Sequence, residues 1–276
     1  MVAVLGIGAT GAFFSDSETS TGNTFTAGAI DLKVDSTQHY NGMVCTNQGS
    51  VEQPDWNWIA EPGYTPVLNQ YPAVGSDCSG RTWTLKDLAP TVDKFFSFGD
   101  VKPGDWGEDT ISLHVDNNDA WACVDITNMT DLDNSQTSPE AVAPLDVDDM
   151  ASGELAEGTY FFAWNDDGDN MFEGSSAGEF PLFSNVMGPA SDALNNKYYT
   201  LADSSTGTPL PGGSTRYVGL AWCAGTLGVT SPVTGGWTCN GSTMGNETQT
   251  DSFTADIGFR VVQARNNPNF TCQMVN

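Results

Sequence analysis

The chain has 276 residues, of which 35 are Asp or Glu and only 9 are Lys or Arg, so its formal net charge is -26. A field of this sign repels nucleic acid and anionic membrane surfaces, so we expect neither as a partner. Hydrophobic residues make up 39%, including 14 Phe and 8 Trp, which is enough for a substantial core in one large all-β domain or two small ones.

The first segment, residues 1–12, is apolar and ends in the small residues Thr10 and Ala12 just before a polar stretch. This pattern is typical of the end of a secretory signal peptide. The segment is too short to span a bilayer, so we expect a secreted, extracellular chain without stable membrane insertion. A buried first strand is the alternative, although the segment's three glycines suit a strand interior poorly.

The next segment has two parts of different character. Phe13 and Phe14 lead into a run of Ser, Thr, Asp, Glu and Gly, and residues 13–26 are therefore predicted to be an N-terminal arm that cannot bury itself. From Ile30 to Val34, apolar residues alternate with charged ones, which predicts a half-buried strand. The alternative for the arm is a flexible leader without contacts.

Beyond this strand, short alternating runs separated by Gly, Pro, Asn and Asp predict an all-β protein. We expect strands at residues 83–88, 95–98, 111–115, 121–126, 159–164, 198–201, 216–223 and 253–261. Residues 38–80 read as a loop-rich insertion, and residues 131–158 as an acidic insertion with a short helix near Met150. Roughly nine or ten strands with long connections fit one antiparallel β-sandwich domain of jelly-roll type, spanning residues 27–276 with long loop insertions.

The six cysteines, without any Cys-x-x-Cys pair, favour disulfides in an oxidising compartment over a metal cluster. Sequence alone leaves fifteen pairings open. Proximity favours two local bridges and leaves one long-range bridge: Cys45–Cys78, Cys223–Cys239 and Cys123–Cys272.

The stretch WNDDGDNMFEG, residues 164–174, has oxygen-bearing side chains at alternate positions, as a calcium-binding loop requires. The candidate ligands are Asn165, Asp167, Asp169, Met171 through its carbonyl, Glu173 and Glu179. Two positions depart from the full loop pattern, because Asn170 replaces Gly and Ser176 replaces the bidentate Glu. A solvated acidic turn is the alternative, and Asp131 with Asp133 forms a weaker second candidate.

Catalytic patterns are lacking in the sequence. It contains no His-Glu-x-x-His, and its two histidines, His39 in a polar loop and His114 on the outward face of a strand, leave no ready zinc triad. We therefore expect no enzyme. Four sequons, at Asn128, Asn240, Asn246 and Asn269, are candidate N-glycosylation sites.

Three stretches carry a family resemblance: AFFSDSETSTGNTFTAGAIDLKVD (residues 12–35), FSFGDVKPGDWGEDTISLHVDNN (96–118) and IGFRVVQARNN (257–267). They resemble secreted fibre proteins of the TasA/camelysin type, which include biofilm matrix fibres and related archaeal bundling pili. The resemblance implies a jelly-roll sandwich whose copies polymerise into an extracellular filament. It does not extend to residues 38–93 and 131–213.

On this hypothesis the polar arm leaves its own domain and adds as a strand to the sheet of the next copy, which builds an open head-to-tail filament. The partners are then further copies of the chain, and neighbouring filaments in bundles. The arm residues proposed for this contact are Phe13, Phe14, Ser15, Asp16, Thr24 and Phe25. Two alternatives are a secreted camelysin-like metalloprotease, and a calcium-dependent module that presents Trp56, Trp58 and Trp237 to a glycan.

Overall fold

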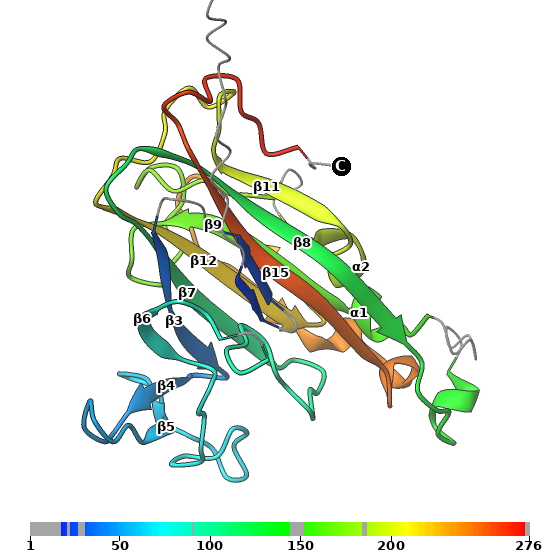
Figure 1. Cartoon of the computed structure of the whole chain (residues 1–276). Coiled ribbons are helices and arrows are strands. Elements are labelled where there is room, and N and C mark those ends of the chain that lie inside the picture. The colour runs from blue at the N-terminus through cyan, green and yellow to red at the C-terminus, as the bar shows by residue number, and fades with distance from the viewer. Residues whose placement is uncertain are drawn as a thin grey trace, which may run out of the picture.

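The computed structural model describes residues 18–20, 23–26, 31–89, 91–143, 152–183 and 187–273. These residues form two β-sheets packed face to face (Figure 1). The sheets are antiparallel except at one strand pair. The expected all-β antiparallel sandwich is therefore confirmed, whereas jelly-roll connectivity stays a prediction.

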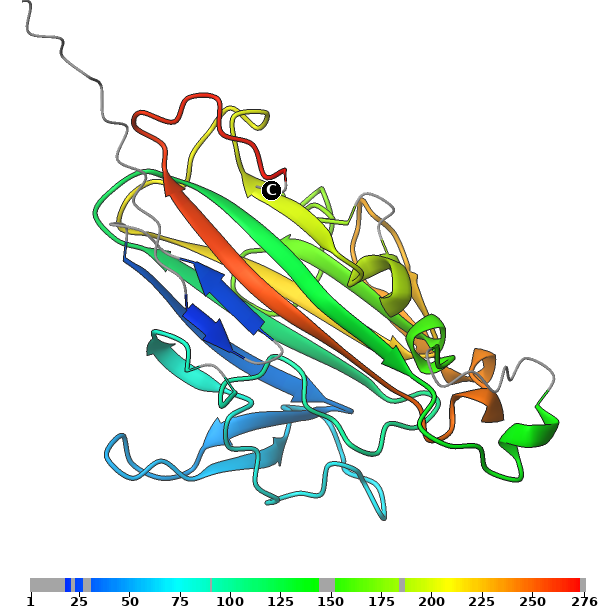
Figure 2. The same ribbon diagram turned by 45° about the vertical axis from the view of Figure 1, so that its right-hand side comes forward.

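The five-stranded sheet has the order β1-β2-β15-β8-β11. Its strands are β1 (Glu18–Ser20), β2 (Asn23–Thr26), β8 (Ala120–Leu132), β11 (Lys197–Ala202) and β15 (Ser252–Gln263). In both ribbon views the long strands β8 and β15 run side by side, and the short β1–β2 hairpin lies beside β15 (Figures 1 and 2).

The eight-stranded sheet has the order β10-β9-β12-β7-β3-β4-β5, and β6 also pairs with β3. Its strands are β3 (Leu32–Tyr40), β4 (Met43–Asn47), β5 (Trp56–Ala60), β6 (Trp83–Lys86), β7 (Trp106–Val115), β9 (Thr159–Asp166), β10 (Met187–Pro189) and β12 (Ser214–Ala224). A separate hairpin joins β13 (Thr226–Val229) and β14 (Trp237–Asn240). The helical turns are η1 (Glu140–Val142), α1 (Leu155–Gly158), α2 (Ala190–Ala193), η2 (Gly241–Thr243) and η3 (Asn246–Thr248).

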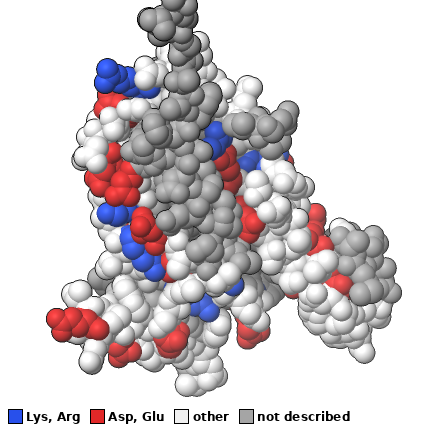
Figure 3. All heavy atoms as spheres, viewed as in Figure 1, with Lys and Arg blue, Asp and Glu red and all other residues white. Residues whose placement is uncertain are grey.

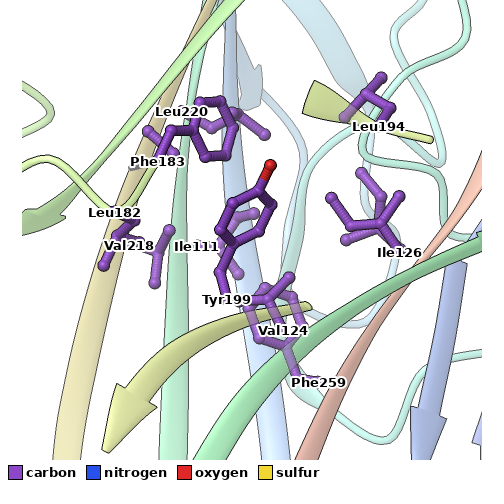
Figure 4. A pocket seen from close by; sticks show the side chains of 12 residues that line it. Ile111, Val124, Ile126, Leu182, Phe183, Leu194, Tyr199, Val218, Leu220 and Phe259 are labelled. Atoms are coloured by element: carbon purple, nitrogen blue, oxygen red, sulfur yellow. The ribbon is translucent and has the colours of Figure 1, made fainter. Parts of the chain in front are cut away.

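The main core lies between the sheets, because the alternating apolar residues of each strand turn inward. Ile111 of β7, Val124 of β8 and Phe259 of β15 are all buried there. A cavity of about 30 Å³ between these residues is lined by apolar side chains (Figure 4). It is far smaller than the several hundred Å³ of a typical ligand pocket, so the sandwich interior is a packed core.

A second apolar cluster covers the other face of the eight-stranded sheet. Phe162 and Trp164 of β9 stack with ring centroids 5.3 Å apart, and Phe172 packs edge-on against Phe162. Gly219 of β12 stands opposite Trp164 in the register, and a Cβ there would lie 2.1 Å from Trp164 Cε2. The cluster thus requires a glycine at this position and holds the residue 165–179 loop against the sheet.

The three disulfides join Cys45 to Cys78, Cys123 to Cys272 and Cys223 to Cys239, as predicted. They indicate an oxidising environment such as the extracellular space or the periplasm. No helix among the described residues is long and apolar enough to cross a membrane.

Three local predictions differ from the structure. Residues 95–98 form no strand, and Phe95 instead fills the core from an irregular segment with 0% exposure. Residues 38–80 contain the end of β3 and all of β4 and β5, which widen the eight-stranded sheet. His39 accordingly lies on β3 and not in a loop. The helix predicted near Met150 lies outside the described residues.

Candidate functional site

The edge of the five-stranded sheet at β1, β2 and β15 is the first candidate site. Here β2 pairs with β15 in parallel, from Asn23 opposite Ile257 to Thr26 opposite Arg260, and β1 folds back antiparallel on β2. Thr24 and Phe25, two of the predicted arm residues, lie in β2. The other four, Phe13, Phe14, Ser15 and Asp16, lie outside the described residues.

β15, the strand with which β2 pairs, is long and is firmly held along its other edge. β15 is 12 residues long, and its opposite edge is held by β8 almost throughout. Ile257 and Phe259 are buried in the core, while Arg260 makes a two-pronged ion pair with Asp125 of β8 at 2.7 and 2.9 Å. The described part of β2 covers only four residues of the other edge of β15. Open main-chain groups at such an edge are a template for another strand.

The acidic loop after β9 is the second candidate site. Ligand oxygens of Asp167, Asp169 and Glu173 lie within 4.8 Å of one another, and those of Asp166, Asp167 and Glu179 do so as well. The structure therefore brings together four of the six predicted ligands. The structure adds Asp166, which the alternate spacing of the predicted ligands missed. Asp166 is the last residue of β9, and its carboxylate accepts a hydrogen bond from Trp164 Nε1 at 2.9 Å.

The other two predicted ligands, Asn165 and Met171, are not carboxylates. Asn165 precedes Asp166 in β9, so its side chain points to the opposite face of the sheet. Met171 was predicted to bind through its backbone carbonyl, and that ligand stays a prediction. Asn170 has a φ of 62°. Its side chain turns inward, accepting from Thr110 Oγ1 at 2.6 Å and donating to Glu108 at 3.2 Å.

Hydrogen bonds inside the loop already use several of the carboxylate oxygens. Glu179 accepts from the backbone N–H groups of Asp167 and Glu173, and burial raises its pKa to about 7. The nearby charge of Asp169 is the main cause of the raised pKa of Glu173. The loop is thus an internally bonded acidic turn with excess negative charge, and calcium binding there stays a prediction.

The remaining candidate residues are dispersed. His39 contacts Glu61 and His114 contacts Asp35, at 2.9 and 3.3 Å, and the potential metal-binding groups among the described residues consist of carboxylates only. The four sequon asparagines are all exposed, and Asn128 donates to Asp256.

The three tryptophans predicted to bind a glycan form no common surface. Trp58 is buried with 3% exposure and packs edge-on against Tyr40, which corrects the prediction that it is exposed. Trp56 is half-buried. Trp237 lies on β14, where its Nε1 donates to Glu108 at 2.6 Å.

Comparison of the chain with protein-family models, with curated proteins and with solved structures found no match. The two candidate sites are therefore interpreted from their own geometry.

Proposed function

We propose that the chain is a secreted structural subunit that polymerises head to tail into an extracellular filament, by strand exchange at the β15 edge. The observation that carries this proposal is the parallel pairing of β2 with β15. It supports the proposal because the N-terminal arm already uses the main-chain contacts that a copy's arm would use. The resemblance to TasA-type fibre proteins points the same way.

Exchange requires that the arm be separable from the rest of the fold. Among the described residues, the β1–β2 hairpin pairs with the remainder of the sheets only through β15, and its strands are three and four residues long. An identical arm from another copy can therefore replace it without disturbing the β15–β8 ladder. Because the donated and accepting surfaces are different, each added copy exposes a new β15 edge, which produces an open filament.

The acidic surface sets a condition on assembly. Acidic side chains are spread over the face seen in Figure 3, with basic side chains among them, and each copy carries a net charge of -26. Like-charged copies repel, and salt screens this repulsion. We therefore propose that filaments, and bundles of filaments, form at high ionic strength or with divalent cations.

Deletion of residues 1–26 tests this function. The variant should remain folded, because the three disulfides and the long strands of both sheets lie in residues 31–273, but it should give no filaments in electron micrographs under conditions in which the full chain forms them. A free peptide spanning the arm should raise the melting temperature of this monomer without restoring filaments. Filaments of normal length from the deleted chain would refute strand exchange.

A cross-linking experiment on the full chain distinguishes an arm that pairs with β15 of another copy from an arm that stays paired with β15 of its own copy. Thr24 and Gly258 are register partners, so the double substitution Thr24→Cys with Gly258→Cys should form a disulfide wherever β2 meets β15. We expect covalent multimers on non-reducing gels of assembled protein and intramolecular bridges in dilute monomer. Thr24→Cys alone is the matched control. If assembled protein contains intramolecular bridges only, the arm does not exchange.

A further inference from the structure

Three carboxylates meet where β8 ends and β15 begins. Asp133 directly follows β8, Asp251 directly precedes β15, and Glu140 is the first residue of η1. Leu132 and Ser252 are register partners at the end of the β8–β15 ladder, so Asp133 and Asp251 leave the two strands as neighbours. One ligand oxygen from each of the three residues lies within 4.8 Å of the other two.

Each of the three side chains has an orphaned oxygen. Asp133 Oδ1, Glu140 Oε1 and Asp251 Oδ1 are buried without a hydrogen-bond partner among the described residues. Asp133 is only 3% exposed and Glu140 only 1%. Burying a charged oxygen without a partner is costly, and here three carboxylates that each have such an oxygen lie close together. A cation is the partner that would satisfy all three at once.

The described part of the chain supplies no such cation through its Lys and Arg side chains. All nine Lys and Arg residues of the chain lie within the described ranges, yet none of the ion pairs formed there includes Asp133, Glu140 or Asp251. Buried carboxylates that have no basic partner are typical of metal coordination. This absence distinguishes the cluster from a structural ion-pair network.

The other oxygens of the cluster hold its side chains in position. Asp251 Oδ2 accepts from the backbone N–H groups of Glu154 and Leu155 at 2.6 and 3.1 Å. Glu140 Oε2 accepts from the N–H of Thr137 at 2.6 Å. These bonds orient two carboxylates while leaving the second oxygen of each available, as outer hydrogen bonds do for metal ligands.

The loop that carries the cluster is also tied to the strand that follows. Asn134 Nδ2 donates to the backbone oxygen of Thr250 at 2.8 Å and to Ser252 Oγ at 2.9 Å, and Thr137 Oγ1 donates to Gln249 at 3.0 Å. Segments that are far apart in the sequence are therefore already held together around the three carboxylates.

We propose that Asp133, Glu140 and Asp251 form a calcium site that fastens the residue 133–142 loop to the start of β15. Carboxylate oxygens are the ligands preferred by hard divalent cations, and calcium accepts irregular arrangements of six to eight oxygens. Magnesium requires a near-ideal octahedron and keeps several waters, which suits this buried cluster poorly. The site is distinct from the residue 165–179 loop, and it does not depend on filament formation.

Calorimetric titration of the full chain with calcium chloride tests the site. Glu140→Gln keeps the shape of the side chain but removes one charged ligand, so it should weaken the tightest calcium affinity at least tenfold. Asp55→Asn, at an exposed carboxyl outside the acidic clusters, is the matched control and should leave that affinity unchanged. Asp167→Asn reports on the acidic loop after β9. Asp133→Asn should reproduce the Glu140→Gln result, which guards against a single variant that folds poorly.

Thermal unfolding at constant ionic strength gives a second readout. The difference in melting temperature between Glu140→Gln and the wild type should change sign when calcium replaces the chelator. In chelator Glu140→Gln should melt at a higher temperature than the wild type, because one unpaired buried charge is gone. In millimolar calcium the order should reverse, because the wild type gains the ion. Damage to folding alone cannot produce this reversal.

Three results would overturn the proposal. The first is an unchanged calcium affinity in both Glu140→Gln and Asp133→Asn. The second is a loss of affinity in Asp167→Asn alone, which would place the ion in the acidic loop. The third is an equal rise in melting temperature with magnesium and calcium in wild type and variants, which would indicate diffuse binding to an acidic surface.

Discussion

Replacing both Cys123 and Cys272 with alanine is expected to lower the free energy of unfolding by about 5 kcal/mol, the largest effect of any bridge in the chain. This disulfide closes a segment with a sequence separation of 149, and in the chain-entropy model the stabilisation grows with the length of the closed loop. The bridge also ties the segment after β15 to β8 in the core, where Cys123 and Cys272 are both buried.

The bridge that closes the shortest loop, Cys223–Cys239, provides the control. Cys223–Cys239 has a sequence separation of only 16, for which the same model gives about 3 kcal/mol. Urea unfolding of both double-alanine variants, with reduced wild type as a reference, measures the difference. An equal loss in the two variants would show that loop length is not the source of the stabilisation.

Substitution of Asp109 with asparagine is expected to stabilise the protein at neutral and higher pH. Asp109 is 1% exposed and shares the inward face of β7 with Ile111. Its Oδ1 accepts from Ser36 Oγ at 2.5 Å, but its Oδ2 has no partner among the described residues, and the same is true of Gln38 Oε1. The register places Gln38 directly opposite Asp109.

Burial raises the pKa of Asp109 well above its usual value of 3.8, so the folded protein keeps a proton that the unfolded chain releases. Since the folded state binds more protons, stability falls as the pH rises from about 4 toward the folded pKa, by about 1.4 kcal/mol per pH unit for this one group. Asp109→Asn presents a neutral group of nearly the same shape at every pH, so it should remove this contribution to the slope.

Urea unfolding at several pH values between 4 and 8 measures the slope. The wild type should lose stability as the pH rises, because Glu108 and Glu179, with pKa values raised by burial to about 8 and about 7, contribute with the same sign. The slope of stability against pH should be smaller in Asp109→Asn by the contribution of this one carboxyl. Asp55→Asn, at an exposed carboxyl, should have the same slope as the wild type. Parallel pH profiles for Asp109→Asn and wild type would mean that Asp109 is ionised in the folded protein.

Alternation of apolar residues was sufficient to predict the strands that pack on both sides of the core. The runs at residues 111–115 and 253–261 lie within β7 and β15, because a period of two assigns each side chain to a face without reference to the rest of the chain. Proximity likewise predicted the two local disulfides, since short loops close at the lowest entropic cost, and the long-range bridge was predicted only as the remaining pair.

The arm was predictable in its polarity but not in its position. Its sequence indicates a segment that cannot bury itself. The strand with which it pairs, however, depends on the order of the strands in the folded sheet, which places β15 next to β2. Phe95 shows the same limit, because it lies in an irregular segment whose place is set by ring contacts with Trp83 and Phe259. Such contacts between distant segments leave no periodic pattern in the sequence.

Local pattern and composition were enough to predict the all-β class, the main strands, the two local disulfides and the acidity of the chain, because each of these depends on nearby residues or on counts. Which carboxylates are buried together depended on the folded arrangement. Asp133, Glu140 and Asp251 belong to three separate segments, and Asp109 acquires its raised pKa from the sheets that cover it. Burial and convergence of charges arise from contacts between distant segments, which no local pattern specifies.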